Sequence, residues 1–340
     1  MLTLEVYFLV AKSALVIGAV DVCVQRINGS CDAGGEWFKR WRPLLFAATI
    51  AFTVLAEGGV LLAALAHTAL SNGTLSVEER GARLNELFSA ATPAIISGTL
   101  TVLALAFALV DICRAPRWLY ARKLQPLAQG VDPVQVYVEM YPTLVRAAFV
   151  THTAGALAAC WWFARCGVDF RGLWGFSVGD DVRSVLPSGI RTAARYAVCD
   201  FLPTLAKFAV GYDTIFFVVH RAMHRSAVLY RRYHALHHVY CSPTAFEGAF
   251  FDPIDLLIGN LFPMLLCAAL ATRSGATIWA LAVLGGGSVA CAHSGYDLRP
   301  LHDPSIHDLH VRVKRRAVRH DVRSAAPVAS GFLSVSPRRG

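Results

Sequence analysis

Long, predominantly apolar blocks are the feature of this sequence that most restricts its fold. They occupy residues 43–66, 93–110, 143–164 and 199–219, and each is close to the roughly 20 residues that cross a hydrocarbon core. Within them the apolar residues run on without the regular polar positions of a soluble amphipathic element. Only 16% of the 340 residues are charged, whereas soluble domains usually carry about a quarter. We therefore expect an all-α integral membrane protein built as a multi-span helical bundle.

Three further apolar blocks complete the predicted layout. Residues 2–24 indicate a first span rather than a removed signal peptide, because no basic segment precedes the apolar run. Residues 256–271 and 276–289 predict a hairpin around the turn 272–275. Seven spans result, with the N-terminus outside. The predicted regions are N-terminal spans and loops (1–197), a histidine-rich domain that includes the hairpin (198–310), and a basic, disordered tail (311–340).

The distribution of positive charge predicts the orientation of the spans. Basic clusters lie at 39–42, 114–123 and 221–232, and two predicted spans separate each cluster from the next. All three therefore fall on one side, which the positive-inside rule makes the cytoplasmic side. Seven of the nine net positive charges lie in 311–340. The rest of the chain lacks the basic folded face of a nucleic-acid-binding module, so we expect no nucleic-acid partner.

The nine cysteines are scattered along the chain, and no CxxC pair occurs. This pattern predicts neither a disulfide framework nor a thiolate zinc site. We expect free, buried thiols.

Histidines gather in the last third of the chain. Five of the twelve lie in the run HRAMHRSAVLYRRYHALHH, which begins at position 220. Spacings of three and four residues place imidazoles on one helical face, where they can share a metal ion. One ion cannot use eight imidazoles, so two ions are expected. The predicted ligands are His220, His224, His234, His237, His238, His293, His307 and His310.

Asp213 is the first candidate for orienting these ligands. Asp213, His220 and His224 are spaced at i, i+7 and i+11, which puts all three on one face of a helix. An ionisable residue inside a span is costly and usually functional. A hydrogen bond from a ligand histidine to this carboxylate would fix the orientation of the imidazole ring.

These stretches resemble the fatty acid hydroxylase/sterol desaturase superfamily of membrane di-iron enzymes. The resemblance covers residues 200–310 and rests on DTIFFVVHRAMH, YRRYHALHHVYCSPTAF, HSGYDL and HDLH. It implies a helical membrane bundle with a cytosolic, histidine-rich cap that binds two Fe ions. His220 and His224 resemble the family's first ligand pair, and the eight predicted ligands together resemble its metal shell.

The sequence departs from the family pattern at three places. Asp252-Pro253 stands where the family usually has His-Pro, so Asp252 is a second candidate carboxylate beside the metals. Val311 stands where the last HxxHH motif would have its third histidine. Segment 311–340 replaces the family's closing segment, and we interpret it as an altered C-terminus.

The resemblance implies an O2-dependent oxidoreductase of lipid biosynthesis that hydroxylates or desaturates a sterol or fatty acyl substrate. Electrons would come from an external donor such as cytochrome b5 or a reductase. The expected location is the endoplasmic reticulum membrane, or the inner membrane of a bacterium, with the histidines facing the cytoplasm. Two alternatives stay open: a non-catalytic, metal-deficient relative with an altered C-terminus, and a divalent metal transporter, because HxxxH inside a span can line an ion path.

Overall fold

The computed structural model describes residues 75–125, 133–170, 196–238, 244–299 and 303–310 without 306 and 308, together with residue 6. Within these ranges the chain is mostly helical and contains two isolated β-bridges but no strand. The predicted spans 2–24 and 43–66 and the tail 311–340 lie outside the described residues.

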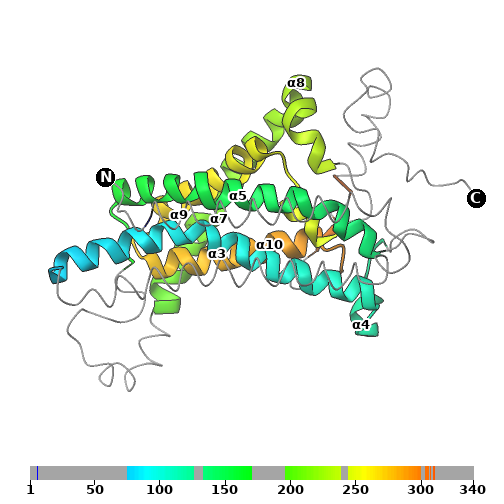
Figure 1. Cartoon of the computed structure of the whole chain (residues 1–340), viewed down its shortest axis with the longest axis horizontal. Helices are drawn as coiled ribbons and strands as arrows, with labels where there is room; N and C mark the ends of the chain where they lie inside the picture. The colour runs from blue at the N-terminus through cyan, green and yellow to red at the C-terminus, as the bar shows by residue number, and fades with distance from the viewer. Residues whose placement is uncertain are drawn as a thin grey trace, which may run out of the picture.

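The helices form an elongated bundle with a separate projecting part (Figure 1). In chain order they are α3 (Val77–Cys113), α4 (Arg117–Tyr120), α5 (Pro133–Cys166), the π-helix η3 (Tyr196–Phe201), α7 (Leu202–Arg225), α8 (Ala227–Leu229), the π-helix η4 (Tyr230–His234), the 3₁₀ helices η5 (Ala235–His238) and η6 (Ala245–Ala249), the π-helix η7 (Asp255–Leu261), α9 (Phe262–Ala271) and α10 (Gly275–His293).

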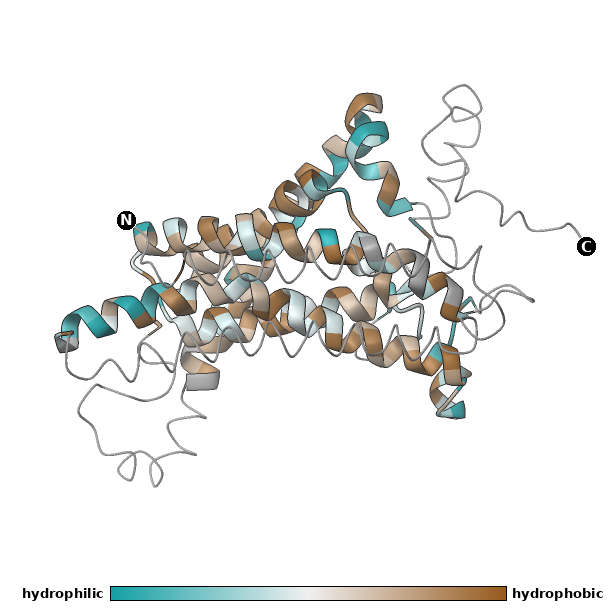
Figure 2. Ribbon diagram, in the orientation of Figure 1, coloured by the Kyte–Doolittle hydropathy of each residue, from teal (hydrophilic) through white to brown (hydrophobic). Residues whose placement is uncertain are grey.

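Four of these helices are long and apolar enough to cross a membrane. They are Glu78–Cys113, Thr143–Cys166, Leu202–Arg225 and Gly275–His293, and apolar residues run along much of the bundle (Figure 2). The first two of these helices contain the predicted blocks 93–110 and 143–164. The other two overlap the predicted blocks 199–219 and 276–289. The block 256–271 forms a shorter apolar helix, Asp255–Ala271. The helical class is therefore confirmed for the described residues, and four of their helices are candidate membrane spans. The two segments of the predicted hairpin form a short helix and a long one.

Helix α3 begins well before the apolar block that predicted it. The Ser76 hydroxyl accepts a hydrogen bond from the Glu79 backbone N–H at 3.2 Å, and the Glu79 carboxylate accepts one from the Ser76 N–H at 2.8 Å. This reciprocal pair is a capping box, which starts a helix by satisfying N–H groups that have no partner in the first turn. With 37 residues and about 1.5 Å of rise per residue, α3 is longer than the hydrocarbon core is thick.

A glycine brings α3 and α10 into close contact. A Cβ atom at Gly286 would lie 2.6 Å from the backbone carbonyl oxygen of Ile96. Small residues allow backbones to approach in membrane bundles, where packing rather than the hydrophobic effect holds helices together. The Gly285–Gly287 run is therefore part of what fixes α10, and with it His293, against the bundle.

The basic segment 114–123 and His293 lie at the same end of the bundle. Helix α10 ends just before Gly295, whose φ of 72° is the left-handed conformation that commonly follows a helix. The Leu124 N–H donates to the Gly295 carbonyl at 2.8 Å, and the Asp297 N–H donates to the Arg122 carbonyl at 3.0 Å. The structure thus places the basic cluster 114–123 beside the end of α10 that carries His293. The distribution of positive charge predicts this cluster and the histidines on the same side of the membrane.

The described cysteines are free. Cys160 and Cys267 are buried, whereas Cys113 and Cys199 are exposed, with Cys166 and Cys291 between these extremes. Six of the nine cysteines lie within the described residues, and none of these six forms a disulfide. The expectation that the thiols are buried is correct for only part of the set.

Candidate metal centre

All eight predicted histidines come together although they arise from four separate parts of the chain. Helix α7 contributes the first pair, η4 and η5 the next three, α10 one, and the segment 303–310 the last two. Two groups have possible ligand atoms within 4.8 Å of one another. The first group is His220, His224, His234 and His310, and the second group is His237, His293 and His307.

The spacing of ring nitrogens in the first group matches the spacing of metal ligands. The Nε2 atom of His310 lies 3.0 Å from that of His220 and 2.9 Å from that of His224, and the Nε2 atoms of His224 and His234 are 3.2 Å apart. Nitrogens bound at about 2.1 Å to one ion, at right angles or at a tetrahedral angle, lie about 3.0–3.4 Å apart. His238 adjoins this group, with its Nε2 atom 3.1 Å from that of His234.

The second group surrounds His307. Its ring centroid is 4.0 Å from that of His293 and 5.4 Å from that of His237. His237 also stacks on Phe251, with ring centroids 4.2 Å apart. The Nδ1 atom of His293 lies 2.8 Å from the Val289 carbonyl oxygen. Because a carbonyl oxygen only accepts, this contact places the proton on Nδ1 and leaves the Nε2 lone pair available to a metal.

Burial keeps three of the imidazoles neutral, as their lowered pKa values indicate. It lowers the pKa of His237 and of His307 well below the ordinary value, and that of His238 to about 2, with the neighbouring histidines adding to the effect. The neutral form is the one that binds a metal. In the described part of the chain, the buried Nε2 of His307 and Nδ1 of His237 have no hydrogen-bond partner, and native structures usually satisfy such atoms. The donor set therefore fits two ions of a metal that accepts imidazole, iron included.

Asp255 supplies the carboxylate beside a predicted ligand. Its Oδ2 atom lies 2.7 Å from Nδ1 of His234, and both side chains are buried. The two carboxylates predicted for this role lie elsewhere. Asp252 accepts a hydrogen bond from the Ile254 N–H at 2.9 Å, and Asp213 lies on an exposed face of α7. Asp255 was not predicted from the sequence. The available signal was an ionisable residue directly before the apolar block 256–271, three positions after Asp252.

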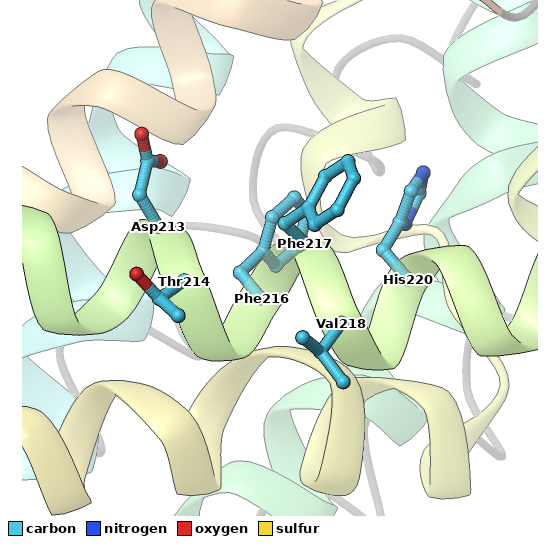
Figure 3. A pocket seen from close by; sticks show the side chains of 6 residues that line it. All are labelled: Asp213, Thr214, Phe216, Phe217, Val218 and His220. Atoms are coloured by element: carbon cyan, nitrogen blue, oxygen red, sulfur yellow. The ribbon is translucent and has the colours of Figure 1, made fainter.

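Asp213 lines an open groove along α7 that leads to His220 (Figure 3). The groove has a volume of about 480 Å³, and its other lining residues are Thr214, Phe216, Phe217 and Val218. The ring of Phe216 stacks on His220, with centroids 5.1 Å apart. A largely apolar surface therefore connects the membrane-spanning part of α7 with the first histidine group.

Comparisons with known proteins match this part of the chain. The fatty acid hydroxylase family model matches residues 205–322. Fatty acid hydroxylase ahd1 of Mycosarcoma maydis is 27% identical over 207 residues, which are 60% of this chain and 47% of the relative. Fatty acid hydroxylase domain-containing protein 2 of Homo sapiens is 28% identical over 113 residues, 32% of this chain and 33% of the relative.

A third relative carries a different activity in its name. Very-long-chain aldehyde decarbonylase GL1-11 of Oryza sativa subsp. indica is 33% identical over 109 residues, 30% of this chain and 40% of the relative. The chain thus spans less than half the length of each of these relatives. No solved structure matches the chain.

Proposed function

We propose that this chain, whose residues 205–322 match the fatty acid hydroxylase family model, is a member of the fatty acid hydroxylase/sterol desaturase superfamily. It would act as a membrane-bound di-iron oxidoreductase that hydroxylates or desaturates a lipid. The observation that carries this proposal is the convergence of seven histidines into two groups, with His238 beside the first group, at the end of apolar helices. Relatives named as a hydroxylase and as a decarbonylase act on fatty acids and very-long-chain aldehydes, which makes a long acyl chain or a sterol the substrate class to test.

The histidines would hold the two irons. When bound, the irons supply activation of O2 for attack on an unactivated C–H bond, which side chains alone do not provide. Asp255 would accept a hydrogen bond from the Nδ1–H of His234, so that Nε2 of this ligand keeps its lone pair toward the first group. The Val289 carbonyl does the same for His293 in the second group.

The groove along α7 would orient the substrate. Its Phe216 and Phe217 side chains offer apolar contact to a lipid chain that enters sideways from the bilayer. Asp213 and Thr214, about two helical turns from His220, offer hydrogen-bonding groups to a polar part of the lipid. Binding along this path would place one C–H bond of the chain beside the first histidine group.

The surroundings of the site suit an external electron donor. Arg221, Arg225, Arg231 and Arg232 are exposed next to the histidines, and a basic surface attracts an acidic partner such as cytochrome b5 or a reductase. We place this surface on the cytoplasmic side, in the endoplasmic reticulum membrane or in a bacterial inner membrane, by the positive-inside rule.

The direct test compares lipids from cells with and without the protein and from cells that make its His237→Ala/His238→Ala variant. We expect a hydroxylated or desaturated lipid that requires the wild-type chain and O2 and is absent with the double variant. A matched control is His152→Gln, because His152 lies within α5 and hydrogen-bonds to Ser97 at 2.7 Å. Product formation by the double variant at the wild-type level would refute the proposal.

A further inference from the structure

A buried polar network joins the end of α3 to the residues that follow His293. Its centre is Asp111, whose carboxylate accepts hydrogen bonds from the hydroxyls of Tyr137 and Tyr296. The ammonium group of Lys123 lies 2.8 Å from the same carboxylate. Asp111 and Lys123 expose only 3% and 2% of their side chains. Asp111, Lys123 and Tyr137 lie outside the segment 205–322 that matches the family model.

Such a network is costly to build. Removing an ammonium and a carboxylate from water carries a penalty that their mutual attraction repays only with good geometry and further hydrogen bonds. Asp111 has these further bonds, since three donors from three other parts of the chain converge on it. A buried ion pair is weak evidence for stability, but it can specify one arrangement of the elements that it joins.

Lys123 acts at the C-terminal end of α10. Its Nζ atom donates to the Ser294 carbonyl at 3.0 Å and lies 4.6 Å from the centroid of the Tyr296 ring. A cation at this position also meets the negative end of the helix dipole. The adjoining backbone bond from Leu124 to Gly295, at 2.8 Å, holds the same stretch. The residues directly after His293 are thus held by a side-chain hydrogen bond from Lys123 and a backbone hydrogen bond from Leu124.

These contacts of Lys123 and Leu124 affect the second histidine group and not the first. His293 is the α10 member of the second group, and its ring is 4.0 Å from that of His307. The first group is instead oriented through Asp255 and His234. A shift at the end of α10 would therefore move one ligand of the second group and leave the first group in place.

We propose that Asp111, Lys123, Tyr137 and Tyr296 form a positioning network that sets the iron affinity of the second histidine group. This inference rests on the proposed function, because it takes the group as an iron site. It assigns to α3 and α5, outside the matched segment, a specific part in assembling the metal centre.

The test uses Tyr296→Phe, which removes one hydroxyl. The variant keeps the ring that stacks on Phe107, with centroids 5.5 Å apart. Tyr296→Phe is combined with each of two histidine variants, one that breaks the first group and one that breaks the second. Fe(II) binding to each purified chain is then titrated anaerobically. In His224→Ala, where the first group is broken, Tyr296→Phe should weaken binding of the remaining ion about 10-fold or more, as loss of orienting contacts does at other metal sites. In His293→Ala, where the second group is broken, the same change should leave Fe(II) affinity unaltered.

Two further variants keep the test decisive. Tyr137→Phe removes the other hydroxyl on Asp111 and should act in the same direction and in the same background. Tyr141→Phe, four positions along α5 in the same core cluster, should have no effect on Fe(II) affinity. Equal losses in both backgrounds, or no loss in either, would overturn this inference while the wild-type chain still binds iron. A wild-type chain that binds no Fe(II) would instead refute the proposed function.

Discussion

At the scale of single residues, the orientation of each imidazole matters as much as its presence. A histidine offers a lone pair to a metal on one ring nitrogen only when the other nitrogen carries the proton. Asp255 imposes that state on His234, and the Val289 carbonyl imposes it on His293. The two groups thus contain different orienting acceptors, a carboxylate and a backbone oxygen.

Asp255→Asn tests the orienting carboxylate. The amide loses the charge that holds the proton on Nδ1 of His234, so Fe(II) affinity of the first group should fall about 10- to 100-fold. Asp252→Asn removes the same charge three residues earlier, where the carboxylate contacts a backbone N–H, and should leave Fe(II) affinity unchanged. Fe(II) titration of the purified variants measures both. A larger loss with Asp252→Asn would show that Asp252, one of the two carboxylates predicted from the sequence, orients the ligands instead of Asp255.

Acidification tests the burial of the second group and His238. Free histidines titrate near the ordinary value of 6.5, whereas the pKa of His238 in the folded chain is lowered to about 2 and that of His237 is also well below 6.5. Below pH 6.5 the unfolded chain therefore binds more protons than the folded chain, and the free energy of unfolding must fall as the pH falls. The Tm of the metal-free protein in detergent should decrease from neutral pH toward pH 5. A Tm that stays constant or rises over this range would show that these histidines are not buried.

At the scale of elements, α10 carries His293 of the second group and depends on its close approach to α3. The Gly286 position allows this approach, because a Cβ atom there would meet the Ile96 carbonyl oxygen at 2.6 Å. The neighbouring Gly287 is less constrained, since its nearest atom is Cδ1 of Leu103 at 3.5 Å. The two glycines therefore differ in what a methyl group would do to the bundle.

Gly286→Ala should destabilise the protein, and Gly287→Ala should not. Overpacking at a close backbone contact typically costs about 1–3 kcal/mol, whereas alanine in an open helical position is better than glycine by about 0.5–1 kcal/mol. Thermal unfolding of the two variants in the same detergent measures the difference. Equal Tm values for both variants would mean that α3 and α10 do not pack through Gly286.

At the scale of the whole molecule, local patterns predicted the apolar helices of the described residues and the histidine cluster, but not the contacts that orient this cluster. Continuous apolar runs and the three- and four-residue histidine spacings are readable in one stretch of sequence. The start of α3 was also local, in the Ser76–Glu79 capping box, but hydropathy does not report it. Asp111 and Tyr296 are separated by 185 positions, and no local pattern predicts that they meet. The choice of Asp255 over Asp252 likewise depends on how the π-helix η7 packs beside His234.

The iron content of the purified full-length protein tests the central claim most directly. After anaerobic loading with Fe(II) and removal of free metal, the two histidine groups predict two irons per chain. The single variants His224→Ala and His237→Ala should each retain one iron per chain. The variant that combines His224→Ala with His237→Ala should retain none. One iron or none in the wild-type chain, or an iron content that the histidine variants leave unchanged, would contradict the di-iron assignment.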